Sequence, residues 1–403
     1  MTSQDWLARL VAIDTTSRNS NLGLIETVRD DLRARGLDPW LSSNAEGTKA
    51  NLFCTLPAQD GGTQGGIALS GHTDTVPVDG QDWSSDPFTL TERDGRLYAR
   101  GSCDMKGFIA CAMALVPEFL ATPRAKPLHL ALSYDEEIAC IGAPVMLADL
   151  QQRGVKVDGA IVGEPTSMQP VVAHKGLNAW RCRVHGKAAH SSLTPQGCNA
   201  IEHAAQLICA IREMAEQWRA NGPFDQFYDV PYSTITTNLI GGGIAMNTIP
   251  QLCEFTYEFR NLPMLSPADI QGRIDAYIQT ELLPRMQREF PGATVEIENL
   301  AAAPGQVFDF NGGAGKLENL AAAPGLDASE QAAITQLVRS LTADKSVRKV
   351  AYGTEAGLFQ GAGIPTVVCG PGSIEQAHKV DEFVDVAQLQ QCEKFLRQVA
   401  ASL

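Results

Sequence analysis

The sequence predicts an α/β protein in which a smaller α+β segment interrupts the larger domain. Apolar, strand-like runs alternate with helix-like segments up to Lys175, a pattern typical of the α/β class. After Lys175 the pattern changes to longer alternating strands and two long helices. A chain of 403 residues with 44% hydrophobic content can bury a large core, and single domains seldom grow so large. Two domains are therefore expected.

The elements before Lys175 are predicted from apolar periodicity. Residues 3–13 fit an amphipathic helix capped by Ser3, and residues 22–35 fit a second helix that ends at Gly36. Further along, short apolar runs predict strands and longer runs predict helices. The expected strands are 51–56, 67–71, 128–133 and 159–163, and the expected helices are 108–119 and 143–152.

The segment after Lys175 predicts an α+β arrangement. Residues 179–184 alternate as a strand does, and residues 195–221 fit one long helix. Two further strands are expected on either side of a glycine turn, followed by a second long helix and a closing strand. These elements are 233–240 and 251–260 around the turn 241–243, the helix 268–288 and the strand 294–297.

One segment occurs twice, at 298–305 and again at 318–325. We interpret the extra length as an insertion in a surface loop, where added residues cost little. A phosphate-binding loop around Lys316 is excluded, because Phe310 stands where a glycine is required and Leu317 replaces Ser or Thr.

Composition excludes several classes of function. The net charge of −14 argues against binding to nucleic acid or to anionic membranes. No basic segment followed by an apolar one marks a signal peptide, and the longest apolar stretch, 108–120, is too short to span a bilayer. The ten cysteines form no Cys-x-x-Cys pair, which favours reduced core thiols in a cytosolic protein over the alternative of disulfides.

Five short segments each carry one candidate metal ligand. The first four follow apolar, strand-like runs, and ligands at strand ends converge on one crevice of an open α/β sheet. Two imidazoles and three carboxylates form an N/O ligand set suited to zinc, cobalt or manganese. The candidates are His72 in Ser70-Gly-His72-Thr-Asp74, Asp104 in Cys103-Asp104-Met-Lys-Gly107, Glu137 in Asp135-Glu136-Glu137, Glu164 in Gly163-Glu164-Pro-Thr166, and His378 in Gln376-Ala-His378.

Together with other motifs, these segments resemble the M20 family of metal-dependent amidohydrolases and peptidases, and within it the acetylornithine deacetylases. The similarity runs from about Trp6 to about Phe395. It implies a catalytic domain with a mixed sheet flanked by helices, as in zinc aminopeptidases, interrupted by a lid domain that dimerises. The implied boundaries are 1–178 and 299–403 for the catalytic domain, with the inserted loop near 306–325, and 179–298 for the lid. The motifs are 70–77, 86–95, 104–107, 163–170, 173–176, 353–356 and 370–378.

The resemblance also implies roles at a centre of two divalent ions, zinc or cobalt. Asp104 would bridge the ions, His72 and Glu164 would hold one, and Glu137 and His378 the other. From the residues alone, Asp104 could instead cap the following helix, and the Glu136–Glu137 pair could be a solvated acidic pair. Asp74 lies two residues after His72, so its carboxylate can orient that imidazole.

The resemblance implies that Glu136 is the general acid and base. In the lid, the resemblance implies that His190 stabilises the oxyanion in the other subunit, with a helix-capping role as the alternative.

Arg260 would bind the substrate carboxylate and Asn247 would be a second polar contact, whereas a surface ion pair is the ordinary explanation for Arg260. Glu355, in Gly353-Thr-Glu355-Ala-Gly357, resembles the acetylornithine deacetylase form of a glycine-rich turn. We expect it to pair with the ornithine side-chain ammonium or, alternatively, to order the loop only.

The expected reaction is the hydrolysis of N2-acetyl-L-ornithine to L-ornithine and acetate, a step of arginine biosynthesis, by a cytoplasmic homodimer. Other family activities remain alternatives: succinyl-diaminopimelate desuccinylase, acetylcitrulline deacetylase, aminoacylase or dipeptidase. A non-catalytic binding protein on the same fold would require a lost ligand or base, and none is missing. The expected partner is thus a small N-acyl amino acid, with no nucleic acid and no membrane.

Overall fold

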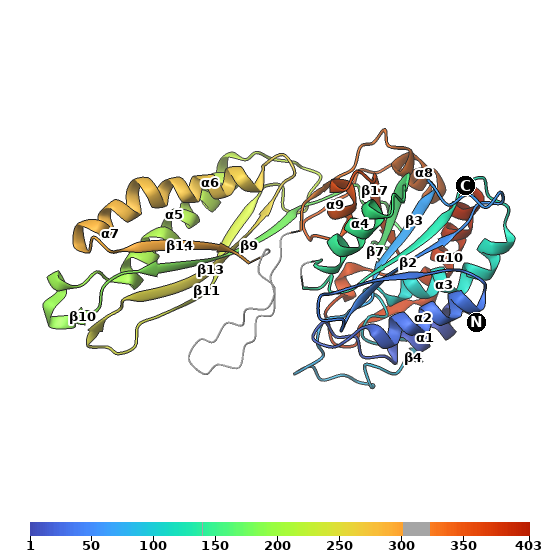
Figure 1. The fold of residues 1–403 in the computed structure, drawn as a ribbon, viewed down its shortest axis with the longest axis horizontal. Helices are drawn as coiled ribbons and strands as arrows, with labels where there is room; N and C mark the ends of the chain where they lie inside the picture. Colours follow the sequence, from blue (N-terminus) through green and yellow to red (C-terminus); the bar gives the residue numbers. More distant parts are fainter. Residues whose placement is uncertain (139, 301–322) are drawn as a thin grey trace. The chain divides into compact units, whose positions relative to one another are not determined.

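The computed structural model describes residues 1–138, 140–300 and 323–403. The chain folds into two compact units (Figure 1). Unit 1 comprises Met1–Ala173, Leu326–Lys349 and Thr354–Leu403, and unit 2 comprises His174–Gly325 and Val350–Gly353. The first change of unit therefore precedes the predicted boundary at residue 178, and unit 2 extends past residue 298. The repeated segment falls largely on 301–322, outside the described residues.

Unit 1 is built on a six-stranded sheet of order β1-β2-β6-β3-β7-β17. Strands β6, β3, β7 and β17 are parallel to one another, whereas β1 and β2 pair in antiparallel fashion at one side. The expected mixed sheet is confirmed, and the carboxyl ends of its parallel strands share one edge. The strands are β1 (Trp40–Ser43), β2 (Ala50–Leu56), β3 (Ile67–His72), β6 (Leu128–Ser133), β7 (Gly159–Pro165) and β17 (Thr366–Gly370).

Helices cover both faces of this sheet, because its strands carry apolar side chains on both sides. In β2, Leu52 and Cys54 enter the larger core, while Phe53 between them enters the smaller one. The larger core contains α1 (Ser3–Val11), α2 (Leu22–Ala34), α3 (Lys106–Ala121), α8 (Ala333–Thr342) and α10 (Val386–Ala401). The smaller core contains α4 (Gly142–Gln152) and α9 (Ala356–Gly361).

Short elements complete unit 1. A three-stranded sheet of order β18-β5-β4 flanks the loop that leads into α3. Its strands are β4 (Thr91–Arg93), β5 (Arg96–Tyr98) and β18 (Phe383–Asp385). A second small sheet has the order β15-β8-β16, with β8 (Ala173–His174), β15 (Leu326–Asp327) and β16 (Lys349–Val350). A short 3₁₀ helix, η3 (Ile374–Gln376), precedes His378.

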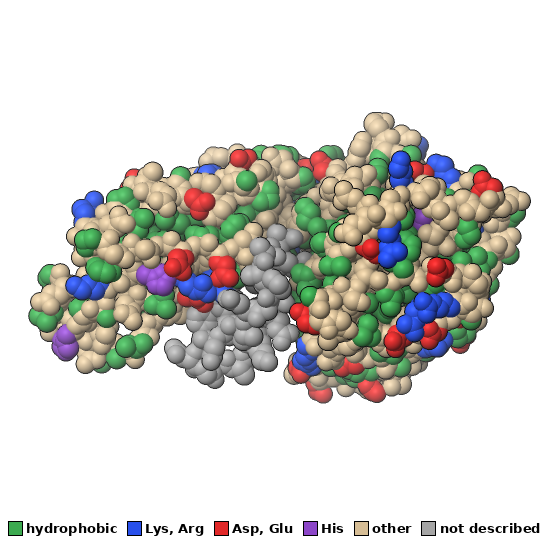
Figure 2. Space-filling model, viewed as in Figure 1, with side chains coloured by type: hydrophobic (Ala, Val, Ile, Leu, Met, Phe, Trp, Pro, Cys, Tyr) green, Lys and Arg blue, Asp and Glu red, His purple; other side chains and the backbone are tan. Residues whose placement is uncertain are grey.

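Unit 2 packs helices on one face of a four-stranded antiparallel sheet of order β11-β13-β9-β14. Cys182 and Phe255 face the helices, whereas Arg183 and Glu254 form an ion pair on the other face. Figure 2 shows acidic, basic and histidine side chains gathered over the β14 part of the sheet. The main elements are β9 (Gly176–His185), α5 (Ala200–Asn221), β11 (Thr234–Gly242), β13 (Leu252–Asn261), α6 (Pro267–Tyr277), η2 (Ile278–Leu282), α7 (Leu283–Glu289) and β14 (Thr294–Asn299). The minor elements are β10 (Ala189–His190), η1 (Ser191–Gln196) and β12 (Thr248–Ile249).

Two helix starts differ from the prediction. The first helix is capped by Thr2 rather than Ser3, through a reciprocal pair of hydrogen bonds with Asp5. The single helix predicted over 195–221 is wrong: α5 begins only at Ala200. Cys198 exchanges both backbone hydrogen bonds with Lys187, so it cannot belong to a helix.

The cysteines have the burial expected of core thiols, and the helices bear on the question of a membrane span. None of the ten cysteines is in a disulfide, and every one except Cys209 is buried. Among the described residues, no helix combines the length and apolar character that crossing a bilayer requires.

Candidate metal and catalytic site

His72 is the last residue of β3 and lies at the carboxyl edge of the sheet in unit 1. Its Nδ1 lies 3.0 Å from the backbone oxygen of Asp74, and its Nε2 lies 3.0 Å from Asp104 Oδ1. The Nδ1 atom is therefore occupied by the protein backbone, which leaves Nε2 directed at the acidic cluster. This is the arrangement in which an imidazole is oriented for metal binding.

Asp104 reaches the same place from a loop. The prediction that it follows a strand of the open sheet is wrong, because β5 belongs to the small β18-β5-β4 sheet. The alternative role as a helix cap is also absent: Met105 occupies the N-cap position of α3, with no side-chain cap. The two Asp104 oxygens face different imidazoles, with Oδ1 at 3.0 Å from His72 Nε2 and Oδ2 at 3.5 Å from His378 Nε2.

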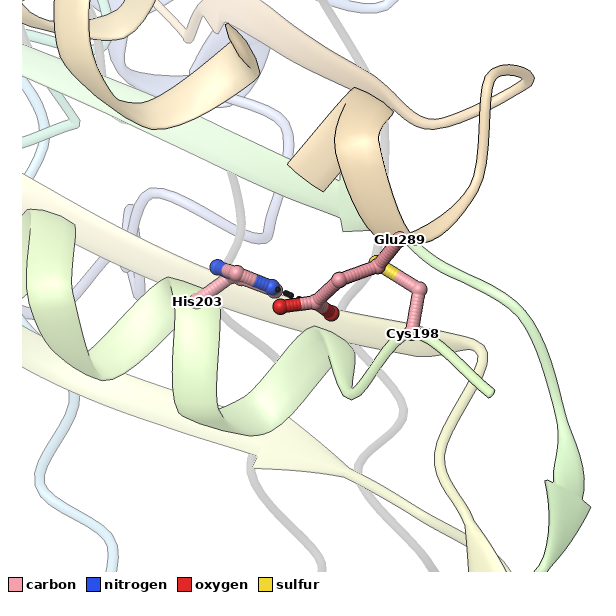
Figure 3. Close-up of side chains that lie close together, drawn as sticks. All are labelled: Cys198, His203 and Glu289. Carbon is pink, nitrogen blue, oxygen red and sulfur yellow. Dashed lines mark hydrogen bonds and ion pairs between the residues drawn. The ribbon is translucent and has the colours of Figure 1, made fainter. Parts of the chain in front are cut away.

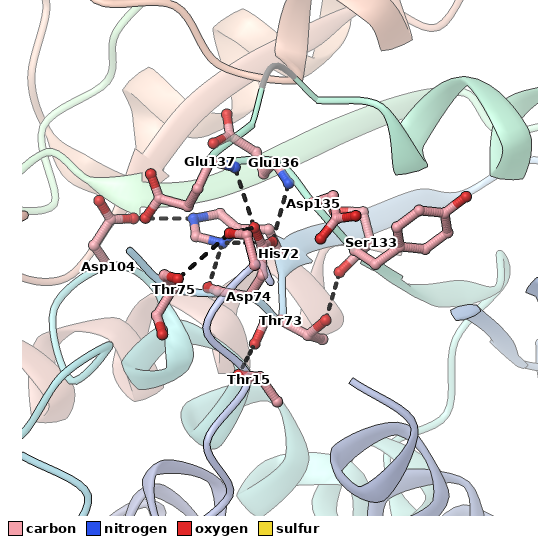
Figure 4. Close-up of polar contacts among 12 residues, drawn as sticks. Thr15, His72, Thr73, Asp74, Thr75, Asp104, Ser133, Asp135, Glu136 and Glu137 are labelled. Atoms are coloured by element: carbon pink, nitrogen blue, oxygen red, sulfur yellow. Dashed lines mark hydrogen bonds and ion pairs between the residues drawn. The ribbon is translucent and has the colours of Figure 1, made fainter. Parts of the chain in front are cut away.

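Glu136 and Glu137 lie in a tight turn after β6. Asp135, directly before them, has a φ of 52°, and its carboxylate lies 2.5 Å from Lys49 Nζ. The backbone N–H groups of Glu136 and Glu137 donate to the two oxygens of Asp74, at 3.0 and 3.2 Å (Figure 4). The turn thus holds two adjacent carboxylates whose side chains meet different partners.

Glu164 projects from β7. Gly163 before it allows a close approach of α3, because a Cβ at this position would lie 2.0 Å from Phe108 Cγ. Glu164 Oε1 is buried, lies 3.7 Å from His72 Nε2 and has no hydrogen-bond partner among the described residues. A buried carboxylate oxygen without a partner is costly and fits a position where a cation binds.

His378 follows η3 and has a φ of 64°. Its Nε2 lies 2.9 Å from Glu137 Oε2, and its side chain is 56% exposed. The structure thus brings all five sequence-predicted metal ligands together in unit 1.

The charge of the cluster favours a divalent cation. Two groups of side chains, His72–Glu136–Glu164 and His72–Asp104–Glu137, each have ligand atoms within 4.8 Å of one another. Burial and the nearby Asp104 raise the pKa of Glu164 well above its usual range, and the same two causes raise the pKa of Glu137. So many carboxylates around two imidazoles need positive charge to remain ionised, and the N/O donors present suit zinc or cobalt.

Glu136 has the environment of a proton carrier. Burial, followed by the proximity of Glu137 and Asp104, raises the pKa of its carboxyl group to about 8. Its Oε1 accepts a hydrogen bond from the Cys140 thiol at 3.3 Å. A carboxyl group whose pKa is shifted toward neutrality can both take up and release a proton near pH 7.

Asp74 has different contacts from those predicted. Its carboxylate lies 3.5 Å from His72 Nδ1, whereas the backbone oxygen of Asp74 lies closer to that atom, at 3.0 Å. Its shorter contacts are with the backbone of Glu136 and with Ser17 Oγ, which donates at 2.7 Å. Asp74 therefore anchors the turn that carries Glu136 more directly than it orients the imidazole.

Glu355 is fully buried, with 0% exposure. Its two oxygens accept hydrogen bonds from Ser70 Oγ and Ser133 Oγ, each at 2.6 Å. Burial raises the pKa of the carboxyl group, and the two hydroxyls oppose the shift. In this conformation neither oxygen is exposed to receive a substrate ammonium.

The remaining predicted residues belong to unit 2. His190 is exposed and caps η1, and its Nδ1 accepts a hydrogen bond from the backbone N–H of Ser192 at 3.2 Å. A neutral imidazole then carries its proton on Nε2, which makes that atom a donor. The backbone oxygen of Asn247 accepts a hydrogen bond at 3.0 Å from the backbone N–H of Ser191, the residue that follows His190. Arg260 is the second-to-last residue of β13, and its Nε lies 3.4 Å from Glu258 Oε1.

A second group of possible metal ligands lies in unit 2 (Figure 3). It comprises Cys198, His203 and Glu289, with His203 Nε2 at 3.0 Å from Glu289 Oε2. The Cys198 thiol donates to the backbone oxygen of Met286 at 3.8 Å, and burial raises its pKa to about 11. These contacts are those of a histidine–carboxylate hydrogen bond and a thiol hydrogen bond, and they join α5 and the residues just before it to α7.

The structure adds residues that the sequence reasoning missed. Ser70 lies two positions before His72 on β3, so strand alternation could have placed both on one side of the sheet. Ser17, Ser133 and Glu382 carried no comparable signal, because their partners are distant in sequence.

The α/β sheet and the acidic cluster at its carboxyl edge define a metallohydrolase. The model of peptidase family M20/M25/M40 matches residues 68–402, and the chain belongs to this family. It is 35% identical to an acetylornithine deacetylase of Erwinia tasmaniensis, covering 96% of this chain and 92% of the relative. It is 34% identical to an acetylornithine deacetylase of Pasteurella multocida, covering 93% and 89%. Its fold is similar to that of an M20 family metallo-carboxypeptidase from Sulfolobus solfataricus, with a TM-score of 0.69 and 16% identity over 99% of this chain and 98% of that one.

Proposed function

We propose that this chain hydrolyses N2-acetyl-L-ornithine to L-ornithine and acetate, as a step of arginine biosynthesis. The observation that carries the hydrolytic part is the buried cluster around His72, in which Glu164 Oε1 lacks a hydrogen-bond partner among the described residues. The choice of substrate is supported by the acetylornithine deacetylases that share about a third of its sequence over most of their length.

Two divalent ions, zinc or cobalt, fit the donor set. His72 and Glu164 would hold one ion, Glu137 and His378 the other, and Asp104 would lie between them. The separate directions of the two Asp104 oxygens support the bridging role. When bound, such ions polarise a carbonyl group and lower the pKa of a water molecule.

Glu136 is proposed as the general acid and base. It accepts a proton from the attacking water at a carboxylate oxygen and delivers that proton to the nitrogen of the departing amine. Its raised pKa supports this role, because the same group must release the proton that it has taken up. Asp74 supports the step by holding the Glu136 backbone.

Unit 2 is proposed to contribute to binding in a homodimer. His190 would donate from Nε2 to the oxygen on which negative charge develops, in the active site of the second subunit; this agrees with its acceptor Nδ1. Arg260 would bind the substrate carboxylate, because a guanidinium offers two parallel donors, and Asn247 would add an amide contact.

For Glu355 we propose a bracing role in place of contact with the substrate ammonium. Its complete burial and its bonds to Ser70 and Ser133 support this choice. Ser70 and Ser133 lie on the two strands that lead to His72 and to the Glu136 turn, so the brace would fix the spacing between them.

A cytoplasmic location is part of the proposal, supported by ten cysteines without a disulfide. The alternative activities are those of other deacylases and dipeptidases. These enzymes would use the same metals and the same base on a substrate with a different acyl group or side chain.

The test is acetate or amine release by zinc- or cobalt-loaded protein across acetylornithine, acetylcitrulline, acetylmethionine, succinyl-diaminopimelate and a dipeptide. We expect acetylornithine to have the highest kcat/KM, and chelation to abolish turnover. A preference for acetylmethionine would identify a general aminoacylase instead. Turnover that survives complete metal removal would contradict the metal-dependent mechanism.

A further inference from the structure

Glu382 is a buried carboxylate that no part of the proposed chemistry uses. It is 1% exposed and lies four positions after His378, directly before β18. Its Oε1 accepts hydrogen bonds from the backbone N–H groups of Cys103 at 2.9 Å and Asp104 at 3.0 Å. Its Oε2 accepts from the N–H of Gly101 at 3.1 Å. One side chain therefore holds three backbone donors of the loop that carries Asp104.

The same carboxylate is paired with Arg100, whose Nη1 lies 2.7 Å from Oε2. Arg100 Nη2 donates at 2.7 Å to Gln81 Oε1, and Gln81 Nε2 donates at 3.1 Å to the backbone oxygen of His378. Arg100 Nη1 also reaches the backbone oxygen of Lys379, at 3.3 Å. A continuous network thus joins the loop of Asp104 to the turn of His378.

We propose that Glu382 is a positioning residue that sets the distance between Asp104 and His378. It would thereby determine the affinity for the second ion, which is the ion that Glu137 and His378 would hold. The inference rests on the proposed metal centre. Asp104 comes from a loop outside the main sheet, so no strand pairing fixes its backbone. His378 lies in a turn, and its side chain is more than half exposed. The Glu382 network fixes the backbone of both.

The pattern of contacts separates this role from ordinary packing. A carboxylate that only stabilised the β18-β5-β4 sheet would bond to strand residues, yet the Glu382 side chain bonds to Asp104 itself and to residues 100, 101 and 103. Groups that orient metal ligands in this way typically contribute about 10- to 100-fold to metal affinity.

The experiment is metal titration of the Glu382→Gln variant, followed by calorimetry and by the visible absorption of bound cobalt. The amide keeps the shape but has one acceptor oxygen, so its NH₂ group must face a backbone N–H donor or Arg100. We expect binding of the first ion to change little and binding of the second to weaken about 10- to 100-fold. Activity should return at high metal concentration, with kcat near that of the wild type.

The matched control is Asp158→Asn. Asp158 also accepts from a backbone N–H, that of Gly66 at 2.9 Å, and from a lysine, Lys126 Nζ at 2.7 Å, but it lies before β7, at the opposite edge of the sheet. Both metal affinities should be unchanged in this variant.

If each ion binds to Glu382→Gln with the same affinity as to the wild type, the inference is overturned, even if the metal-free variant is less stable in urea. If Glu382→Gln does not fold, Gln81→Ala provides the decision, because Gln81 is partly exposed and its loss removes the direct hydrogen bond to His378, leaving only the longer contact of Arg100 with Lys379. Unchanged binding of the second ion in Gln81→Ala would then overturn the inference. Absence of metal binding by the wild-type protein would instead contradict the proposed function.

Discussion

Asp74 accepts a hydrogen bond at 3.0 Å from the backbone N–H of Glu136, so a residue just after β3 fixes the turn that follows β6. The parallel pairing of β3 with β6 places these chain segments side by side. Because the anchor acts on the backbone of Glu136, the carboxyl group remains available for chemistry. The precision of the proposed base therefore depends on a neighbouring strand.

Replacing Asp74 with Asn should disturb this anchor. The amide has a single acceptor oxygen, so its NH₂ group must face the N–H of either Glu136 or Glu137. We expect kcat/KM to fall about 10- to 100-fold, the usual effect of losing a group that orients metal ligands. Steady-state kinetics at saturating metal measures the change. Ser17→Ala, which removes only one hydroxyl donor to Asp74, should have a smaller effect, and equal losses in the two variants would contradict the argument.

Glu136→Gln should separate chemistry from metal binding. The amide cannot carry the proton, so we expect kcat to fall about 10²- to 10⁴-fold. The metal content, measured by atomic absorption, should remain that of the wild type. Glu137→Gln is the comparison, because it removes the carboxylate that faces His378 and should lower the metal content. A Glu136→Gln enzyme with normal kcat would exclude this residue as the base.

Glu355→Gln distinguishes bracing from recognition of the ammonium group. If Glu355 is a brace, turnover of acetylornithine and of acetylmethionine should fall by the same factor. The free energy of unfolding should also fall, by about 1–3 kcal/mol, because one serine hydroxyl loses its acceptor in a buried site. A selective loss of acetylornithine turnover would favour ammonium recognition instead.

His174 predicts a pH dependence of stability. Burial lowers the pKa of its imidazole to about 4, whereas an unfolded histidine titrates near 6.5. The unfolded chain therefore binds the proton first, and stability is lost as pH falls from about 6.5 to about 4, by up to roughly 3 kcal/mol. Urea unfolding of His174→Gln across this range should show a shallower dependence. His185→Gln, at the end of β9, is the control, and identical slopes for wild type and His174→Gln would contradict the prediction.

Four of the six strands in the main sheet of unit 1, β2, β3, β6 and β7, are predicted closely, because they are short apolar runs bounded by polar residues, whereas β1 and β17 are not predicted. The 128–133 strand, for example, matches β6 at both ends. The helix predicted over 195–221 starts too early. Its first residues are polar or small, and the backbone hydrogen bonds that join Cys198 to Lys187 leave no pattern in the sequence.

The ligand set at the site could be predicted from local motifs, but the groups that support it could not. Glu355 bonds Ser70 across 285 positions, and Glu382 bonds Asp104 across 278. Such pairs have no periodicity and no fixed spacing, since they depend on how the sheet brings distant segments together. The loop origin of Asp104 was missed for the same reason: residues 96–98 form a strand, but in a different sheet.

The order of the chain has a consequence for synthesis on the ribosome. Unit 1 is discontinuous, and β17, His378 and Glu382 all come after the whole of unit 2. While unit 2 is being translated, the outer edge of β7 has no neighbouring strand, and the acidic cluster lacks its second imidazole. The nascent protein must therefore keep an open sheet edge from aggregating, and the five proposed metal ligands can come together only after the C-terminal segment has left the exit tunnel.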